Sequence, residues 1–200
     1  MAKMIVSPVT LEGPSLRLEP LTEAHHGPFC AIGLDEELWR WSPTPLRTPD
    51  EMAAYIAFAL GEQARGAALP FAVVEKSSGR VVGSTRYGAI EPGHHRVEIG
   101  WTWLARPWHR TATNTEAKYL LLRHAFETLG CIRVELKTDA LNERSRAAIR
   151  RIGAREEGIL RSHMITASGR IRDTVYYAIN DAEWPEVKTG LEHRLSIPTR

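Results

Sequence analysis

Apolar residues along the chain fall into short alternating or continuous runs separated by turn residues, and these runs predict a sheet. Such runs, bounded by glycine, proline or small polar residues, are typical of β-strands. The predicted strands span residues 16–21, 71–75, 80–87, 96–104, 131–137, 159–166 and 171–179. The polar turn at 76–79 predicts a hairpin between the second and third of these strands.

Capping residues and apolar positions at helical spacing predict helices between the strands. We expect helices after Thr22 and over residues 49–65, 113–129, 142–152 and 181–190. A glycine directly follows three of these segments, as is common at helix C-termini. The order of elements predicts an α+β fold in which helices flank one mixed sheet.

Size and composition fit one domain over residues 1–200. A chain of 200 residues with 43% hydrophobic content can bury one substantial core. The formal net charge of +2 is too small to indicate a nucleic-acid partner, although it is compatible with one local basic site for a small anion. The eight histidines show no spacing with carboxylates that is typical of a metal site, so we expect no metal.

The cysteines and the apolar segments bear on the cellular compartment. Cys30 and Cys131 are far apart in sequence and lie outside any C-x-x-C pattern, which argues against a disulfide framework or a thiolate zinc site. Residues 1–8 lack the apolar core of a signal peptide, and no apolar segment reaches membrane-spanning length. We therefore expect a cytoplasmic protein with no membrane partner.

The predicted helix 113–129 has a marked start that could hold a phosphate group. Thr113 and Glu116 have the spacing of a capping box. A helix start presents unpaired N–H groups at the positive end of the helix dipole. The cations around this start are Arg106, His109, Arg110 and Lys118. The alternative is an ordinary capped surface helix that carries a few cations.

Several segments stand in an order that matches a known superfamily. They are residues 16–21 (LRLEPL), 97–101 (VEIGW), 114–127 (NTEAKYLLLRHAFE), 142–149 (NERSRAAI), 153–158 (GAREEG), 169–173 (GRIRD) and 183–185 (EWP). Over about residues 14–190 the chain resembles the GNAT superfamily of acyl-CoA N-acyltransferases. More narrowly, it resembles the branch of Rim-type ribosomal-protein N-terminal acetyltransferases.

The resemblance implies a mostly antiparallel sheet of about seven strands that is splayed between strands four and five. In the superfamily the pantetheine arm of the co-substrate acetyl-CoA lies in that gap, paired with the backbone at the positions of Trp103 and Leu104. The pyrophosphate lies on backbone N–H groups at the following helix start. In this chain the corresponding residues are His109, Arg110, Thr111, Ala112, Thr113, Asn114 and Thr115.

The usual loop pattern of the superfamily, (Gln/Arg)-x-x-Gly-x-(Gly/Ala), falls on residues 109–114. This chain departs from it at His109, Ala112 and Asn114. Alanine retains most of the close backbone approach that glycine allows, and asparagine tolerates a left-handed conformation. We therefore expect the loop to bind the diphosphate; whether the three departures weaken or alter this binding is left open by the sequence.

The resemblance assigns roles to two residues at the start of helix 142–152. Asn142 hydrogen-bonds the pantetheine arm, and Ser145 gives a proton to the departing thiolate. The alternative is that Asn142 only caps the helix and Ser145 only fills its first turn. The helix also carries Arg144, Arg146, Arg150 and Arg151. These form a solvated face, of which one or two could meet the 3′-phosphate of the cofactor.

Alternation along strand 96–104 places Glu98, Gly100 and Thr102 on one face, which we expect to line the cleft. Trp101 and Trp103 fall on the other face and are expected to pack as core or rim residues.

Glu98 is the candidate catalytic base, since a carboxylate in the cleft could take the amine proton directly or through water. The alternative is a solvated glutamate or one that pairs with an arginine. His163 on strand 159–166 is a competing base. Rim-type enzymes can use a glutamate on this late strand, but residues 161–165 contain no carboxylate, so that role is not carried over.

The resemblance implies an acetyl-CoA-dependent N-acetyltransferase that acts by direct transfer in a ternary complex, because neither cysteine lies near the predicted thioester. The acceptor is a primary amine, first of all a protein or peptide N-terminus. One alternative is a small molecule, such as an antibiotic, an amino sugar or a polyamine, which predicts a narrow acidic pocket. Another is a non-catalytic acyl-CoA-binding module. A homodimer is implied by the resemblance alone.

Trp39, Trp41 and the proline-rich loop around them are expected over the acceptor side, where they could shape specificity. The alternative is a plain surface loop.

Overall fold

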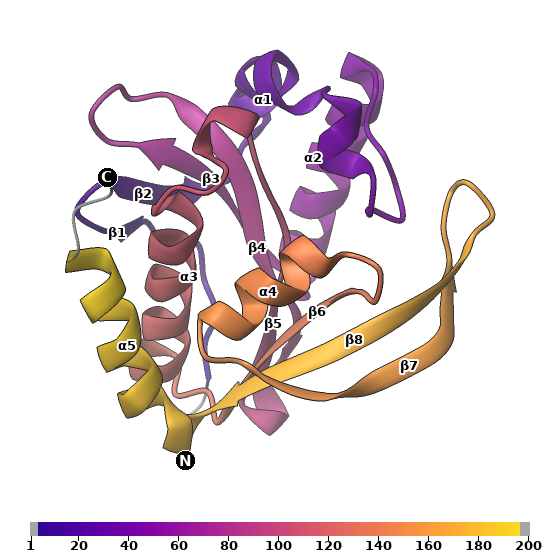
Figure 1. The fold of residues 1–200 in the computed structure, drawn as a ribbon. Helices are drawn as coiled ribbons and strands as arrows, with labels where there is room; N and C mark the ends of the chain where they lie inside the picture. The colour runs from indigo at the N-terminus through magenta and orange to yellow at the C-terminus, as the bar shows by residue number, and fades with distance from the viewer. Residues whose placement is uncertain (1–3, 197–200) are drawn as a thin grey trace.

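The structure, a computed structural model, describes residues 4–196 as a central sheet with helices on both faces (Figure 1). The strands in this range are β1 (Leu11–Glu12), β2 (Leu16–Pro20), β3 (Leu69–Glu75), β4 (Val81–Glu91), β5 (Arg96–Leu104), β6 (Arg133–Asp139), β7 (Arg155–Ile165) and β8 (Ile171–Asn180). Their order in the sheet is β1-β2-β3-β4-β5-β6-β8-β7. Neighbouring strands are antiparallel except for the parallel pair β5–β6.

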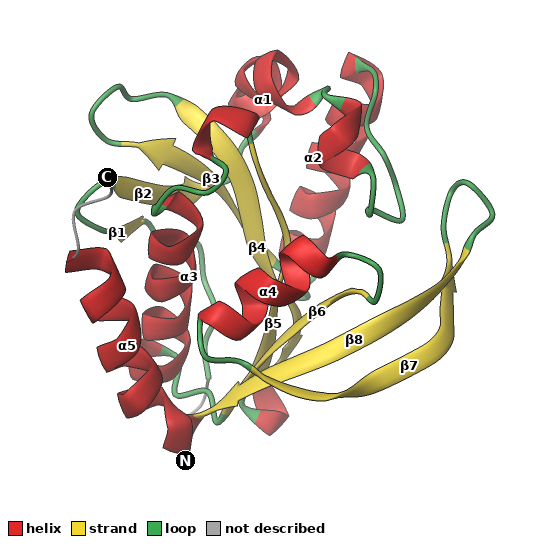
Figure 2. Cartoon of the chain, in the orientation of Figure 1, coloured by secondary structure: helices red, strands yellow, loops and turns green. Residues whose placement is uncertain are grey.

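Helices and single helical turns surround this sheet (Figure 2). The α-helices are α1 (His26–Gly33), α2 (Pro49–Ala64), α3 (Thr113–Arg123), α4 (Glu143–Arg151) and α5 (Trp184–Ser196). Short 3-10 turns occupy Glu23–His25, Glu36–Trp39, Pro92–His94, Arg106–Trp108 and Asp181–Glu183. A π-helical turn at His124–Thr128 extends α3.

Two hydrophobic cores cover opposite faces of the sheet. One contains Phe71 and Val73 together with residues of α3 and α5. The other contains Ala72 and Trp103 together with residues of α1 and α2. Consecutive strand residues point to opposite faces, so the alternation along β3 shows that this strand is covered on both sides.

The predicted α+β fold is confirmed, and the predicted strands and helices are present with shifted boundaries. β1 was not predicted, because a two-residue strand is too short to show a period. β7 begins at Arg155 instead of 159, and α5 continues to Ser196 instead of ending near 190. The predicted domain, 1–200, includes residues 1–3 and 197–200, which lie outside the described residues.

The predicted splay is present between β5 and β6, the fourth and fifth strands of the prediction. The two strands pair only from Arg96 with Arg133 to Glu98 with Glu135. Beyond that point β5 continues to Leu104 and β6 continues to Asp139, but the two strands no longer pair with each other. In Figure 1 the β6–β8–β7 part of the sheet runs away from the rest, and α4 crosses the view between the two parts.

A bulge in β5 adds to this separation. Ser84 of β4 lies opposite Trp103, but Arg86 lies opposite Gly100, so β5 holds one more residue than β4 over this stretch. Trp101, within the stretch, has a φ of +49°. A bulge of this kind shifts the side-chain alternation of its strand by one residue.

The predicted alternation of strand 96–104 is therefore wrong beyond Gly100. Thr102 lies on the α3 face, where its Oγ1 accepts a hydrogen bond from Lys118 Nζ at 2.5 Å. Trp103 lies on the opposite face, where its ring centroid is 5.0 Å from that of Phe29 and 5.7 Å from that of Trp39.

The predicted capping box at the start of α3 is wrong as well. Ala112 is the N-cap residue and makes no side-chain cap. Glu116 is 3% exposed, and its Oε1 accepts hydrogen bonds from the Ser15 and Leu16 amides at 2.8 and 2.9 Å. The carboxylate thus ties α3 to the start of β2, because it accepts from one part-buried and one buried amide there.

We expect Glu116→Ala to lower the free energy of unfolding by about 3 kcal/mol, since it leaves two amides without a charged acceptor. Glu116→Gln keeps one amide oxygen as an acceptor and should cost less. Urea denaturation measures both, with Glu186→Ala on the exposed side of α5 as the control. Equal stability of the Glu116→Ala and Glu186→Ala proteins would contradict this role.

Candidate active site

The loop between β5 and α3 borders the region where β5 and β6 part. After the turn at Arg106–Trp108, Arg110 has a φ of +61°. Ala112 has a φ of −68° and ordinary helical backbone, and Asn114 lies within α3. Glycine is therefore not needed at either position for conformational reasons. The strained residue of the loop is Arg110, at a cost of roughly 1–2 kcal/mol.

Threonine hydroxyls brace the loop against the helix. Thr111 Oγ1 donates to the Trp108 carbonyl at 2.8 Å and accepts from the Thr113 amide at 3.2 Å. The amides of Asn114 and Thr115 are next in the first turn, where a helix offers no backbone acceptor of its own. They remain available to an anion at the positive end of α3.

His109 connects the end of β5 with α4. Its Nε2 is 2.8 Å from the carbonyl oxygen of Leu104, and its Nδ1 is 3.5 Å from Arg144 Nη1. The Trp103 carbonyl points toward Gly83 of β4, so the Leu104 carbonyl points away from β4, toward the opening. Pairing of a ligand with the Leu104 carbonyl would therefore replace the His109 hydrogen bond.

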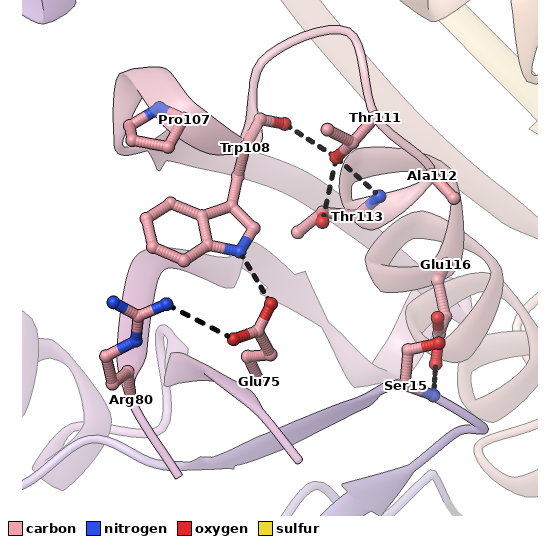
Figure 3. A pocket seen from close by; sticks show the side chains of 9 residues that line it. All are labelled: Ser15, Glu75, Arg80, Pro107, Trp108, Thr111, Ala112, Thr113 and Glu116. Carbon is pink, nitrogen blue, oxygen red and sulfur yellow. Dashed lines mark hydrogen bonds and ion pairs between the residues drawn. The ribbon is translucent and has the colours of Figure 1, made fainter. Parts of the chain in front are cut away.

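Two cavities border this loop. One, of about 200 Å³, is lined by Glu37, Leu38, Arg106, His109 and Arg144. The other, of about 470 Å³, is lined by Ser15, Glu75, Arg80, Pro107, Trp108, Thr111, Ala112, Thr113 and Glu116 (Figure 3). The larger cavity carries two carboxylates and one arginine, whereas the smaller one carries two arginines, a histidine and one carboxylate, so the smaller cavity suits a diphosphate better.

Contacts distinguish among the arginines of α4. Arg146 bonds to the Tyr177 hydroxyl and to Glu143, and Arg151 bonds to the Thr115 hydroxyl. Arg150 lies 3.7 Å from a carboxylate oxygen of Glu156. Arg144, by contrast, is directed to His109 at the basic cavity. It is the α4 arginine that best fits a phosphate contact.

Asn142 and Ser145 lie at the start of α4, as predicted. The Asn142 side chain caps the helix by accepting a hydrogen bond from the Ser145 amide at 3.1 Å. Ser145 is half-buried, and its hydroxyl makes no hydrogen bond to any residue between 4 and 196. The hydroxyl is therefore available to a ligand.

Glu98 occupies the last β5–β6 pair before the strands part. Its neighbours Val97 and Ile99 belong to the α3 core, so Glu98 faces the α1–α2 side. It is 4% exposed, and its Oε2 is 2.9 Å from Lys137 Nζ. Burial lowers the pKa of Lys137, but the hydrogen bond and charge of Glu98 outweigh burial and raise it. Glu98 is thus ion-paired, with a lysine in place of the expected arginine.

His163 lies on the same face as Glu98, although on β7. Its ring meets the Tyr176 ring edge-on, with 5.9 Å between centroids. Tyr176 is opposite Lys137 in the β6–β8 pair, and the Lys137 ammonium is 5.8 Å from the centre of the Tyr176 ring. The α1–α2 face thus carries a continuous polar surface that includes Glu98, Lys137, Tyr176 and His163.

The proline-rich loop reaches over this face. The Ala167 amide, at the tip of the β7–β8 hairpin, donates to the Pro43 carbonyl at 3.0 Å. The Arg170 guanidinium lies 5.7 Å from the centre of the Trp41 ring. Trp39 differs, since it is 7% exposed and donates to the Gly33 carbonyl. Trp41 therefore lies over the α1–α2 face, while Trp39 belongs to the core.

Two of the cations expected around the helix start have other partners. Arg106 bonds to Asp35. Lys118 is 6% exposed and points into the α3 side of the sheet, where it bonds to Thr102 and, among residues 4–196, forms no ion pair. Burial lowers the pKa of Lys118 to about 7.

Sequence reasoning missed the residues of the α1–α2 face that surround Glu98. Lys137, Arg86 and Arg172 were not singled out. Arg86 and Arg172 are buried, and Lys137 is the ion-pair partner of Glu98. The available signal was a charged residue inside a predicted strand, as Arg86 is within 80–87.

Among residues 4–196 no group of three metal-ligating side chains is close enough to hold an ion. In the same range, the helices are too short or too polar to cross a bilayer.

This chain is similar to known proteins in sequence and in structure. A sequence profile described as "Acetyltransferase (GNAT) domain" matches residues 15–155. The crystal structure of a GCN5-related N-acetyltransferase from Brucella melitensis is 33% identical, covers 96% of this chain and 87% of its own, and superposes with a TM-score of 0.88.

Two further proteins bear names of the Rim type. "Putative ribosomal N-acetyltransferase YdaF" of Bacillus subtilis is 33% identical over 106 residues, which are 53% of this chain and 57% of YdaF. The chain thus spans little more than half of that relative. Mycobacterium smegmatis RimJ, solved with CoA-disulfide, shares the fold with a TM-score of 0.81 at 24% identity, over 94% of this chain and 95% of its own.

From about pH 7 to about pH 8.5 we expect the stability of the wild-type protein to rise relative to Lys118→Met. The amine has a pKa of about 7 when folded and about 10.4 when unfolded. The unfolded state therefore binds more protons in this window, and the free energy of unfolding increases with pH. Below about pH 7 the amine is protonated in both states, and the full destabilisation of the folded state by the buried Lys118 charge is present.

Urea denaturation at several pH values measures this difference, with Lys76→Met on an exposed turn as the control. The upper limit of the pH range stays below the ordinary pKa of a thiol. Burial raises the pKa of Cys131 to about 12, so titration of this thiol at higher pH would change stability in the opposite sense. Parallel curves for wild type and Lys118→Met would show that the amine does not titrate in this range.

Proposed function

This chain belongs to the GNAT acetyltransferase family, and we propose that it transfers the acetyl group of acetyl-CoA directly to a primary amine, in the first place a protein or peptide N-terminus. The observation that carries the proposal is the parting of β5 from β6 beside a basic helix start. The name of YdaF and the CoA complex of RimJ support it.

The diphosphate of coenzyme A would lie on the amides of residues 109–115. Arg144 supplies positive charge there, and Asn114 and Thr115 supply unpaired amides. The pantetheine arm would follow the unpaired edge of β5 past Leu104 and Trp103 toward Glu98. Asn142 borders the same opening from the start of α4.

Transfer to an amine needs a proton acceptor for the ammonium and a proton donor for the leaving thiolate. Glu98 is our proposed proton acceptor, with His163 as the alternative on the same face. Ser145, whose hydroxyl is free in the described structure, would give its proton to the thiolate.

Direct transfer is supported by the state of the cysteines. Burial raises the pKa of Cys131 to about 12, so its thiol stays protonated and is a poor nucleophile. Both cysteines are free, which fits the reducing cytoplasm that we propose as the location.

We expect Arg144→Gln to weaken acetyl-CoA binding about tenfold, because it removes a charge-assisted phosphate contact. Isothermal titration calorimetry measures the Kd, and 3′-dephospho-CoA identifies which phosphate the arginine meets. Arg65→Gln, at the exposed end of α2, is the matched control. A wild-type protein that does not bind acetyl-CoA would falsify the proposed function.

We expect Ser145→Ala to lower kcat about 100-fold while the Kd for acetyl-CoA changes less than about twofold. Thiol release from acetyl-CoA with an amine acceptor measures kcat, and Ser196→Ala is the control. An unchanged kcat would remove Ser145 from the proton transfer. Binding of acetyl-CoA without thiol release, across peptides and small amines, would instead indicate a non-catalytic module.

A further inference from the structure

We infer that the amine acceptor carries a carboxylate group, which Arg86 binds beside the transfer site. The inference rests on the proposed acetyl transfer and specifies the substrate class of that same site. It also separates the candidate acceptors, because amino sugars, aminoglycosides and polyamines carry positive charge and lack this group.

Arg86 lies at the centre of the sheet and yet has no acidic partner among residues 4–196. It is 1% exposed, and its guanidinium carbon is 4.8 Å from the centre of the Tyr55 ring and 5.1 Å from that of the Trp101 ring. Its Nε and Nη2 are buried and make no hydrogen bond within residues 4–196. The two aromatic rings hold the guanidinium plane but cannot replace hydrogen-bond acceptors.

Leaving such a group unpaired is costly, because a buried cation loses its hydration and needs compensation from hydrogen bonds or an opposite charge. The unpaired atoms of Arg86 are adjacent N–H groups of one planar fork. That fork matches the two oxygens of a carboxylate. A carboxylate on the acceptor would therefore satisfy the site that the folded chain leaves open.

Other polar atoms of this face are also left without partners. The buried unpaired atoms on it include Tyr55 Oη, Trp103 Nε1, Arg172 Nε and Thr174 Oγ1. Each of them can donate a hydrogen bond. The face thus has donors in excess, and an acceptor-rich ligand complements it.

The carboxylates of the face are already engaged. Glu98 pairs with Lys137, and Asp139 pairs with Arg170 and lies 3.9 Å from Arg172. Arg86 is left as an additional positive charge. A polycationic acceptor would meet repulsion here, whereas an anionic group would be attracted.

Arg86 is close enough to the proposed chemistry to serve the same substrate. Arg86 is opposite Gly100, and Gly88, two residues on, is opposite Glu98. Arg86 and Glu98 are therefore diagonal neighbours, which are roughly 7–8 Å apart in a regular antiparallel sheet. This spacing calls for a carboxylate within a few bonds of the amine.

Trp101 controls access to the guanidinium. Its side chain is half-exposed, and its ring lies 5.1 Å from the Arg86 guanidinium and 6.0 Å from the Lys137 ammonium. Because Arg86 itself is buried, the indole covers it from solvent, and a bound carboxylate would displace the ring.

A carboxylate near a primary amine occurs in two sources, an acidic peptide N-terminus and a free amino acid. The first arm of the test compares the tripeptide amides Ala-Asp-Phe, Ala-Asn-Phe and Ala-Lys-Phe. The second arm compares alanine with alaninamide. Thiol release from acetyl-CoA gives kcat and KM for each acceptor with wild type, Arg86→Met, Arg86→Lys and the control Arg17→Met on the exposed side of β2.

We expect wild type to favour the carboxylate-bearing member of at least one arm, and the arm that responds identifies the source. Arg86→Met should raise the KM for that acceptor about ten- to hundredfold, the range for a lost hydrogen bond to a charged group. The KM for the matched amide should change less than about twofold, as should all values for Arg17→Met.

Arg86→Lys keeps the charge without the planar fork and should raise the same KM, so it serves as the second variant if Arg86→Met does not fold. Equal use of Asp, Asn and Lys peptides and of alanine and alaninamide by wild type would overturn the inference. So would an Arg86→Met protein whose KM values all change alike, since that pattern indicates a packing role. No thiol release with any acceptor would instead contradict the proposed function, and the inference with it.

Discussion

The short parallel contact between β5 and β6 is the constraint on which the rest of the site depends. Three residues of each strand pair, and then the two strands separate although both continue. The bulge at Trp101 turns β5 as it leaves, and the loop at its end leads directly into α3. The open strand edge, the helix start and the Glu98 carboxylate are therefore positioned by one local feature of the sheet.

The two faces of the sheet around this opening differ in chemistry. On the α3 side the opening is bordered by an apolar core, beside which the buried Lys118 is held by Thr102. On the α1–α2 side it is bordered by charged and aromatic residues, with Glu98, Lys137 and Arg86 at the centre. A ligand that lies between the strands meets hydrocarbon on one side and a dense polar surface on the other.

Much of the fold could be predicted from the sequence because periodicity and capping are local properties. The strands at 96–104 and 171–179 and the helix after residue 48 agree with the structure within a residue or two. The bulge at Trp101 could not be predicted, since it depends on how two strands pair. The capping-box reading of Glu116 was wrong because amides 100 residues away offered the carboxylate a better-buried role.

For the site, the resemblance pointed to the loop before α3 and to the start of α4, and these segments follow the ends of β5 and β6. It could not locate Arg86, because the lack of a partner is a property of the whole fold and leaves no pattern in one strand. It also could not choose among the arginines of α4, whose partners come from β7, β8 and α3.

The contact between Pro43 and Ala167 has a mechanical consequence. One hydrogen bond and one cation–aromatic contact bridge the two parts of the sheet at their far ends. Such contacts contribute about 1 kcal/mol each, far less than the global stability of a domain of this size. The far ends of the two parts are thus held together by weak contacts, and the Ala167 amide proton should exchange with solvent each time its hydrogen bond opens.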